Sequence, residues 1–295
     1  MDTNKFFSFS RVAMVMKRDF MENWKRNLYG FIGLYAALAL PMIGNMWGMS
    51  GDALSDPELF FQRYCSNISG TFILVIHICS FVYAADILSN MKTKEMRISF
   101  LMLPATMIEK YVARFLIVTV GVAIFTLVGM LLAEATRYIF LPLFDLPEAF
   151  HRSVLLKMVA VLGMDDGQVL HISHSMPYIY WLGDLCGLTA FAWTHSLYIL
   201  GGSYWHKNAF LKTVGTLFLL LILGSVCMVQ IGDWIGESAI SNMVEWMEAH
   251  LQWVTLNKVL AMGVAFFSGL TLFNWWLAYR LFTRSQVVKP KFRLL

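Results

Sequence analysis

The stretch 112–133, VARFLIVTVGVAIFTLVGMLLA, contains a single charged residue, Arg114, close to its start. An α-helix needs about 20 consecutive apolar residues to cross the hydrocarbon core of a bilayer. A second stretch, 213–231, contains no charged residue at all. These two runs predict membrane-spanning helices, and the rest of the chain is interpreted from them.

The whole chain has the composition of a membrane protein. Of its 295 residues, 58% are hydrophobic and 14% are charged, whereas about 25% of the residues of an average soluble domain are charged. In water such a chain would expose large apolar areas. We therefore predict an all-α integral membrane protein with one six-span domain over residues 29–280. The predicted spans are about 29–48, 70–90, 113–134, 178–201, 212–231 and 257–280.

The Lys and Arg residues give these spans an orientation. Eighteen of the 23 lie before the first span, between spans two and three, between spans four and five, after the sixth, or at the adjoining end of a span, as Arg114, Lys212 and Arg280 do. Cytoplasmic segments of membrane proteins carry the excess of Lys and Arg. The distribution predicts that both termini are cytoplasmic, which requires an even number of spans. Residues 281–295 then form a basic cytoplasmic tail.

Two segments outside the spans are amphipathic. Residues 1–28 carry apolar residues at helical spacing with basic residues between them, namely Val12, Val15, Met16, Phe20 and Trp24. This pattern predicts a cytoplasmic helix that lies in the membrane interface; the alternative is a simple basic tail that enforces orientation. Residues 233–256, between spans five and six, show a similar stripe with three tryptophans, which predicts a helical segment against the outer leaflet.

The segment 91–112, MKTKEMRISFLMLPATMIEKYV, is called the inner segment below. It is the longest predicted internal cytoplasmic loop, and it mixes charged residues with apolar ones that a solvated loop does not need. The apolar residues could pack on the membrane surface or dock a partner, and the sequence favours neither.

The chain has no motif for catalysis. It lacks the GxxxxGK[ST] phosphate-binding loop of ATPases and the GxSxG and HExxH motifs of hydrolases. No set of three or four metal ligands shows the spacing of a zinc site. We therefore expect no enzyme activity, no cofactor and no resident metal, and nothing in the charge pattern predicts a nucleic-acid partner.

Asp184 lies inside the fourth predicted span. A carboxylate near the bilayer centre costs about 2.5–3.5 kcal/mol on insertion scales. It should therefore face the bundle interior, a partner or water. One reading makes Asp184 part of a proton or substrate path. The other is a structural hydrogen bond to Thr189, to His195 or to another helix.

Two cytoplasmic stretches resemble a known family. They are 97–114, RISFLMLPATMIEKYVAR, and 201–213, GGSYWHKNAFLKT. Together with the predicted topology, they are similar to the ABC-2 type permeases of ATP-binding cassette exporters, and to a Bacteroidetes branch of that family. The resemblance implies a permease in a bacterial inner membrane that moves an unknown substrate.

The resemblance also implies partners. Two permeases, identical or different, would pair in the lipid, and separate ATPase subunits would bind the ATP and dock beneath them. The inner segment would then be the coupling helix that contacts the ATPase, through Glu95, Arg97, Phe100, Leu101, Leu103, Glu109 and Lys110. The helix in 1–28 would transmit motion to the first span. The alternatives are a secondary transporter that uses Asp184 and a membrane scaffold that does not transport.

Overall fold

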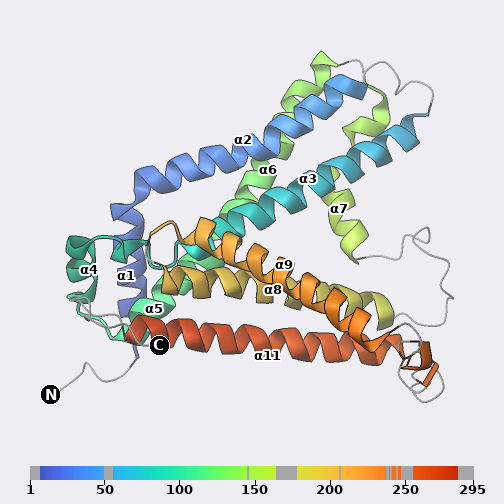
Figure 1. Ribbon diagram of the computed structural model, residues 1–295. Helices are drawn as coiled ribbons and strands as arrows, with labels where there is room; N and C mark the ends of the chain where they lie inside the picture. Colours follow the sequence, from blue (N-terminus) through green and yellow to red (C-terminus); the bar gives the residue numbers. More distant parts are fainter. Residues whose placement is uncertain are drawn as a thin grey trace. The chain divides into compact units, whose positions relative to one another are not determined.

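The computed structural model describes residues 7–49, 56–144, 146–163, 178–205, 207–236, 239, 241–243, 245–246 and 255–284. Within these ranges the chain is almost entirely helical and has no strand, so the predicted all-α class is confirmed. The long helices of Figure 1 are α2 (Trp24–Met49), α3 (Pro57–Ala85), α6 (Val122–Phe140), α8 (Tyr178–Tyr204), α9 (Ala209–Ile235) and α11 (Leu256–Thr283). The shorter elements are α1 (Phe9–Glu22), η2 (Ser89–Met91), α4 (Lys94–Leu101), α5 (Met107–Leu116), η3 (Ile117–Gly121), η4 (Leu141–Leu143), η5 (Glu148–His151) and α7 (Val154–Gly163).

The chain folds into two compact units. The first comprises the described residues within 1–83 and 101–171, and the second comprises those within 84–100 and 172–295. The boundary between them falls three times in the sequence: at 83/84 near the end of α3, at 100/101 at the end of α4, and at 171/172, which lies outside the described residues. Each unit is described by itself below.

The core of the first unit is built by α2, α3 and α6. Residues four apart along a helix lie on one face, and each of these helices places its large apolar residues on such a face. From α2 these are Leu34, Leu38, Met42 and Met46, and from α3 they are Tyr64, Ile68 and Phe72. The hydroxyl of Tyr64 donates to the carbonyl oxygen of Met42 at 3.0 Å, so this phenol is paired within the core.

A single long helical stretch runs from α5 through η3 into α6. The middle part, η3, is a π-helical segment, and such segments change which residues face a given neighbour. Before it, α5 packs on α1, and after it, α6 packs on α2. Gly129 permits the second contact, because a Cβ at that position would lie 3.3 Å from the Leu38 side chain.

The second unit contains α8 and α11, which lie side by side along most of their length (Figure 1). A buried polar pair joins them. The Asn274 side-chain amide donates to Ser196 Oγ at 2.9 Å, and Ser196 in turn donates to the carbonyl oxygen of Trp193 at 2.6 Å. Hydrogen bonds of this kind are a common link between membrane helices.

Two glycines at the end of α8 allow its backbone to approach its neighbours. A Cβ on Gly202 would collide with the backbone of Ala85, with the carbonyl carbon 2.8 Å away, and a Cβ on Gly201 would collide with Thr213 of α9. Both lie in the stretch 201–213. The end of α8 therefore packs at backbone distance on both the last turn of α3 and the start of α9.

Five described helical stretches are long and apolar enough to cross a membrane: Trp24–Trp47, Pro57–Met91, Met107–Leu143, Ala209–Ile235 and Leu256–Thr283. They agree with five of the six predicted spans. The fourth predicted span, 178–201, is helical as α8 but is not among the five, because Asp184, His195 and several Gly, Tyr and Trp residues lower its hydropathy.

The helices are longer than the predicted spans. The largest difference is in α3, which begins at Pro57 where the apolar run begins near residue 70, because a helix continues through polar residues beyond the apolar core. Residues 1–6, residues 285–295 of the predicted tail and half of the predicted outer segment 233–256 lie outside the described residues.

Candidate functional site

The first half of the inner segment forms α4, most of which belongs to the second unit. Lys94, Glu95 and Met96 at its start are exposed. The pKa of Glu95 lies below its usual range, first because its own backbone N–H at the helix start binds the carboxylate and then because of the Thr93 hydroxyl. The first turn of α4 therefore presents a charged, ionised surface with one methionine on it.

Two predicted contact residues of α4 point inward. Arg97 is half-buried, and its Nη2 donates to the carbonyl oxygen of Met91 at 3.3 Å. Phe100 is 5% exposed, and its ring centroid lies 6.3 Å from that of Phe282 in α11. These two side chains hold α4 within the second unit.

The turn after α4 belongs to the first unit. Leu101 and Leu103 are half-buried, whereas Met102 between them is 78% exposed. Lys110 of α5 is buried, and its Nζ donates to the carbonyl oxygen of Leu101 at 2.7 Å. The lysine therefore ties the end of α4 to the first turn of α5.

Glu109 joins the N-termini of two helices. It is 0% exposed, and its carboxylate accepts hydrogen bonds from the backbone N–H of Thr106, the N-cap of α5, at 2.8 Å and of Ser8, the N-cap of α1, at 2.7 Å. Backbone N–H groups at helix N-termini are unpaired within the helix and favour negative charge. One carboxylate thus serves both helices.

Arg11 adds a cation to this arrangement. Its Nη2 lies 2.7 Å from Glu109 Oε1, and its Nε lies 3.0 Å from Oε2. The pKa of Arg11 is raised above its ordinary value, first by its hydrogen bond to Glu109. Paired forks of this kind are the strong form of an ion pair.

A second ion pair fixes the other end of α1. Asp19 Oδ2 lies 2.6 Å from Arg114 Nη1, and the side chains are 4% and 2% exposed. Val12 and Val15 are buried on the same face of α1. The helix is therefore fixed to α5 at both ends and in the middle, and Asn23 ends it before α2 begins.

The structure separates the seven predicted contact residues into two groups. Glu95 is exposed, and Arg97, Leu101 and Leu103 are partly so. Phe100, Glu109 and Lys110 are buried and have their partners inside the chain.

Three exposed apolar residues of the inner segment are not among the seven predicted contacts: Met96, Met102 and Ile108, which are 40%, 78% and 46% exposed. The role of Glu109 had a readable signal, since Thr106-x-x-Glu109 is the capping-box pattern that begins a helix. No sequence pattern indicated that Glu109 would also bind the start of α1.

Asp184 is exposed on α8. The expected hydrogen bond from Thr189 is not formed, because its hydroxyl donates to the carbonyl oxygens of Leu185 and Cys186, both at 3.0 Å. His195 is buried further along the helix, with its ring 6.2 Å from that of Phe191. Asp184 is therefore exposed and has no hydrogen bond to any residue that the structure describes.

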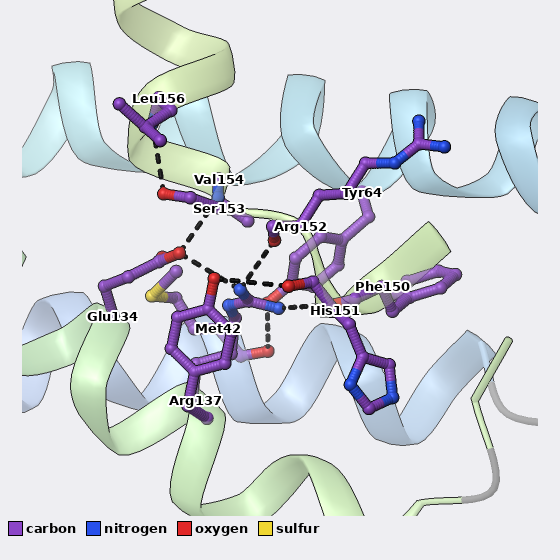
Figure 2. A network of polar contacts seen from close by, with 11 residues as sticks. Met42, Tyr64, Glu134, Arg137, Phe150, His151, Arg152, Ser153, Val154 and Leu156 are labelled. Carbon is purple, nitrogen blue, oxygen red and sulfur yellow. Dashed lines mark hydrogen bonds and ion pairs between the residues drawn. The ribbon is translucent and has the colours of Figure 1, made fainter. Parts of the chain in front are cut away.

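A polar network lies at the other end of the first unit (Figure 2). Arg137 of α6 is 0% exposed. Its Nη1 donates to the carbonyl oxygen of Phe150 at 2.8 Å, and its Nη2 donates to that of Arg152 at 2.8 Å and to Glu134 Oε1 at 3.0 Å. Glu134 Oε1 also accepts from the backbone N–H of Val154 at 2.9 Å. The pair thereby holds η5 and the start of α7 against α6.

Within the described part of the chain, Glu134 Oε2 and Arg137 Nε are buried without a hydrogen-bond partner. The ring of Tyr138 lies 4.4 Å from the Arg137 guanidinium carbon and covers one side of the charge. This network was not predicted, because both residues had been counted only as charges at the end of a span.

Among the described residues, no three His, Cys, Asp or Glu side chains are grouped so that they could hold a metal ion. Comparison of the chain with protein-family models, with curated proteins and with solved structures found no match.

Proposed function

We propose that the chain is the membrane-spanning permease subunit of an ABC-type exporter, which moves its substrate with energy from a separate ATPase subunit. In this proposal α8 also crosses the membrane as the fourth of six spans, both ends of the chain are cytoplasmic, and two permeases pair in a bacterial inner membrane. The five apolar helices, the bias of Lys and Arg and the resemblance of stretches 97–114 and 201–213 to ABC-2 permeases support it.

The observation that carries the proposal is the surface of the inner segment. Its part in the second unit exposes Met96 beside the charged Lys94 and Glu95, and its part in the first unit exposes Met102 and Ile108. Exposed apolar side chains within a charged surface are typical of a docking site. The five residues replace Phe100, Glu109 and Lys110 as the proposed contacts with the ATPase, because those three are buried.

The internal bonds of the segment suggest how a docked ATPase would act. Lys110 joins the end of α4 to α5, and Glu109 and Arg114 join α5 to α1. A force on Met102 would therefore reach α5 and α1 together. ATP binding shifts the conformation only if the ATPase contacts the two states differently, and a turn held by its neighbours can transmit that difference.

Site-specific photocrosslinking tests the proposal. A photoreactive amino acid at Met102, in membranes of the native host, should give an adduct with a protein that binds ATP and contains its own phosphate-binding loop. The same amino acid at Leu156, which is 72% exposed on α7, should not. Charge introduced by Met96→Glu with Met102→Glu should abolish both the adduct and the co-purified ATPase activity. An adduct at Leu156 alone, or full ATPase activity with the double variant, would contradict the proposal.

A second candidate function is secondary transport, and the exposed carboxylate of Asp184 favours it. A carboxylate inside an apolar helix that has no hydrogen bond among the described residues is expected to meet water, a partner or a transported ion. Asp184→Asn should abolish proton-coupled uptake into vesicles under this reading, and leave ATP-driven transport intact under the first. Asp233→Asn, at an exposed carboxylate near the end of α9, is the matched control.

A further inference from the structure

Helix α1 has two apolar faces, and one of them is buried against the described residues of its own unit. Val12 and Val15 pack towards α5. The opposite face consists of exposed apolar side chains, namely Phe9, Met14, Phe20 and Met21, followed by Trp24 at the start of α2; their exposed fractions lie between 51% and 80%. The apolar residues that were predicted to form one stripe therefore lie on two faces: Val12 and Val15 are buried, whereas Phe20 and Trp24 are exposed.

The charges of this region are distributed unevenly between the two faces. Both acidic residues of α1 are paired, Asp19 with Arg114 and Glu22 with Arg18. On the exposed side, Lys17 lies one turn from Phe20 and Met21, and Lys25 follows Trp24. The Lys25 Nζ lies 5.8 Å from the centre of the Trp24 ring, so an ammonium group and an indole are presented together.

We infer that the exposed face of α1, with Trp24 and Lys25, binds anionic phospholipid, with the lysines on the headgroup phosphates and the aromatic and methionine side chains in the acyl region. Charge complementarity carries this assignment: the face offers Lys17 and Lys25, and the exposed acid of α1, Glu22, is paired with Arg18. A purely apolar face would insert into any lipid, whereas lysines beside it select lipids with a net negative headgroup.

The contacts that α1 makes with Glu109 and Arg114 keep its exposed face preformed. Because Glu109 and Arg114 hold both ends of the helix, α1 does not have to fold on the membrane, as free amphipathic segments do. Binding therefore loses little conformational entropy. This inference is independent of the exporter proposal, since it concerns a lipid surface and not transport or ATPase docking.

Quenching by spin-labelled lipids tests the inference on the full chain. Cys79, Cys186 and Cys227 are replaced by serine, and the buried Cys65 is kept. A Met21→Cys substitution then carries an environment-sensitive fluorophore. The protein is reconstituted in phosphatidylcholine vesicles that contain a small, equal fraction of doxyl-labelled phosphatidylglycerol or doxyl-labelled phosphatidylcholine. Leu220→Cys, at an exposed position of α9, provides the control for non-selective lipid contact.

Each lysine near an anionic lipid surface is worth about a fivefold enrichment. We therefore expect the anionic quencher to be at least about threefold more effective than the neutral one at position 21, and equally effective at position 220. Lys17→Gln with Lys25→Gln should bring the ratio at position 21 to one. Lys207→Gln with Lys212→Gln, which removes the same charge at two other exposed lysines, should leave it unchanged.

Three outcomes would overturn the inference. Equal quenching by both lipids at position 21 would mean that the face does not select charge. Absence of quenching by either lipid would mean that water or a protein covers it. A ratio that survives Lys17→Gln with Lys25→Gln, or that falls equally in the Lys207 and Lys212 control, would mean that the selection does not reside in this face.

Discussion

Asp19 of α1 and Arg114 of α5 form an ion pair in which Oδ2 and Nη1 lie 2.6 Å apart, with 4% and 2% of the side chains exposed. The residues are 95 positions apart in the sequence. Loss of one partner from this buried pair leaves a charge without water or a counter-ion and lowers the stability of the protein. The pair of Arg18 and Glu22 in the same helix is exposed, so water and salt can replace a lost partner. The two pairs therefore allow a matched comparison.

Asp19→Asn should destabilise the protein by about 3–5 kcal/mol, because it leaves the Arg114 charge buried and unpaired. Arg18→Gln should change the free energy of unfolding by less than about 1 kcal/mol, as exposed pairs do. Denaturation in mixed micelles measures both. Asp19→Leu combined with Arg114→Met should recover most of the loss; a double variant as unstable as Asp19→Asn would show that the pair is not the cause.

Replacement of Glu109 should cost more than removal of the local helix cap. Thr106→Ala removes one capping hydrogen bond and should cost about 1 kcal/mol. Glu109→Gln removes the charge and one of two acceptor oxygens that bind Ser8, Thr106 and Arg11, and hydrogen bonds to charged groups are worth about 1.5–3 kcal/mol each. We expect a loss of about 2–4 kcal/mol in the same micelle assay. Equal effects of the two variants would contradict a role for Glu109 beyond α5.

Arg137→Lys should loosen η5 and α7. An ammonium group cannot reach the two carbonyl oxygens and the carboxylate that the planar guanidinium binds, so a carbonyl is left buried and unpaired, at a cost of about 1–3 kcal/mol. Hydrogen exchange of residues 148–163 should become faster. Arg152→Gln, which breaks only the exposed ion pair with Glu58, should leave that exchange unchanged; a matching acceleration in this control would refute the assignment to Arg137.

Gly202→Ala should prevent the end of α8 from closing on α3, because the new Cβ would meet the backbone of Ala85, which cannot move aside as a side chain can. The expected result is a large loss of monodisperse protein in size-exclusion chromatography after detergent extraction. Gly215→Ala on α9, where nothing lies within 4 Å of the added Cβ, should be neutral or slightly stabilising. Similar yields of both variants would argue against the close approach.

The helices could be predicted from the sequence because a membrane span depends on a local sum of apolar residues. Each of the six predicted stretches is helical, and five meet the requirements of a span. The predicted spans are shorter than the helices, as in α3, which begins at Pro57. Hydropathy identifies the part of a helix in the apolar core, whereas the helix ends where its backbone hydrogen bonding stops. The hydropathy of α8 is low because the helix carries polar residues such as Asp184, His195 and Ser196. The buried Ser196 is accommodated because Asn274 of α11 donates a hydrogen bond to it.

The contacts of the inner segment could not be predicted in the same way. Glu109 looked like an exposed loop residue because its partners Ser8 and Arg11 are about 100 positions away. A charge pattern does not distinguish a charged side chain that faces water from one that is buried against a charge on another helix. The lengths of the helices follow from local sequence, whereas the burial of Glu109, Lys110 and Arg137 follows from tertiary structure.

The double role of Glu109 has a consequence for the order in which the protein is made. Ser8, Arg11 and Asp19 leave the ribosome first, while the groups that complete them, Glu109 and Arg114, come later. Until Glu109 and Arg114 are synthesised, the N–H of Ser8 at the start of α1 lacks its acceptor, and Arg11 and Asp19 lack their ion-pair partners. Helix α1 can therefore pack on α5 only after translation has passed residue 114.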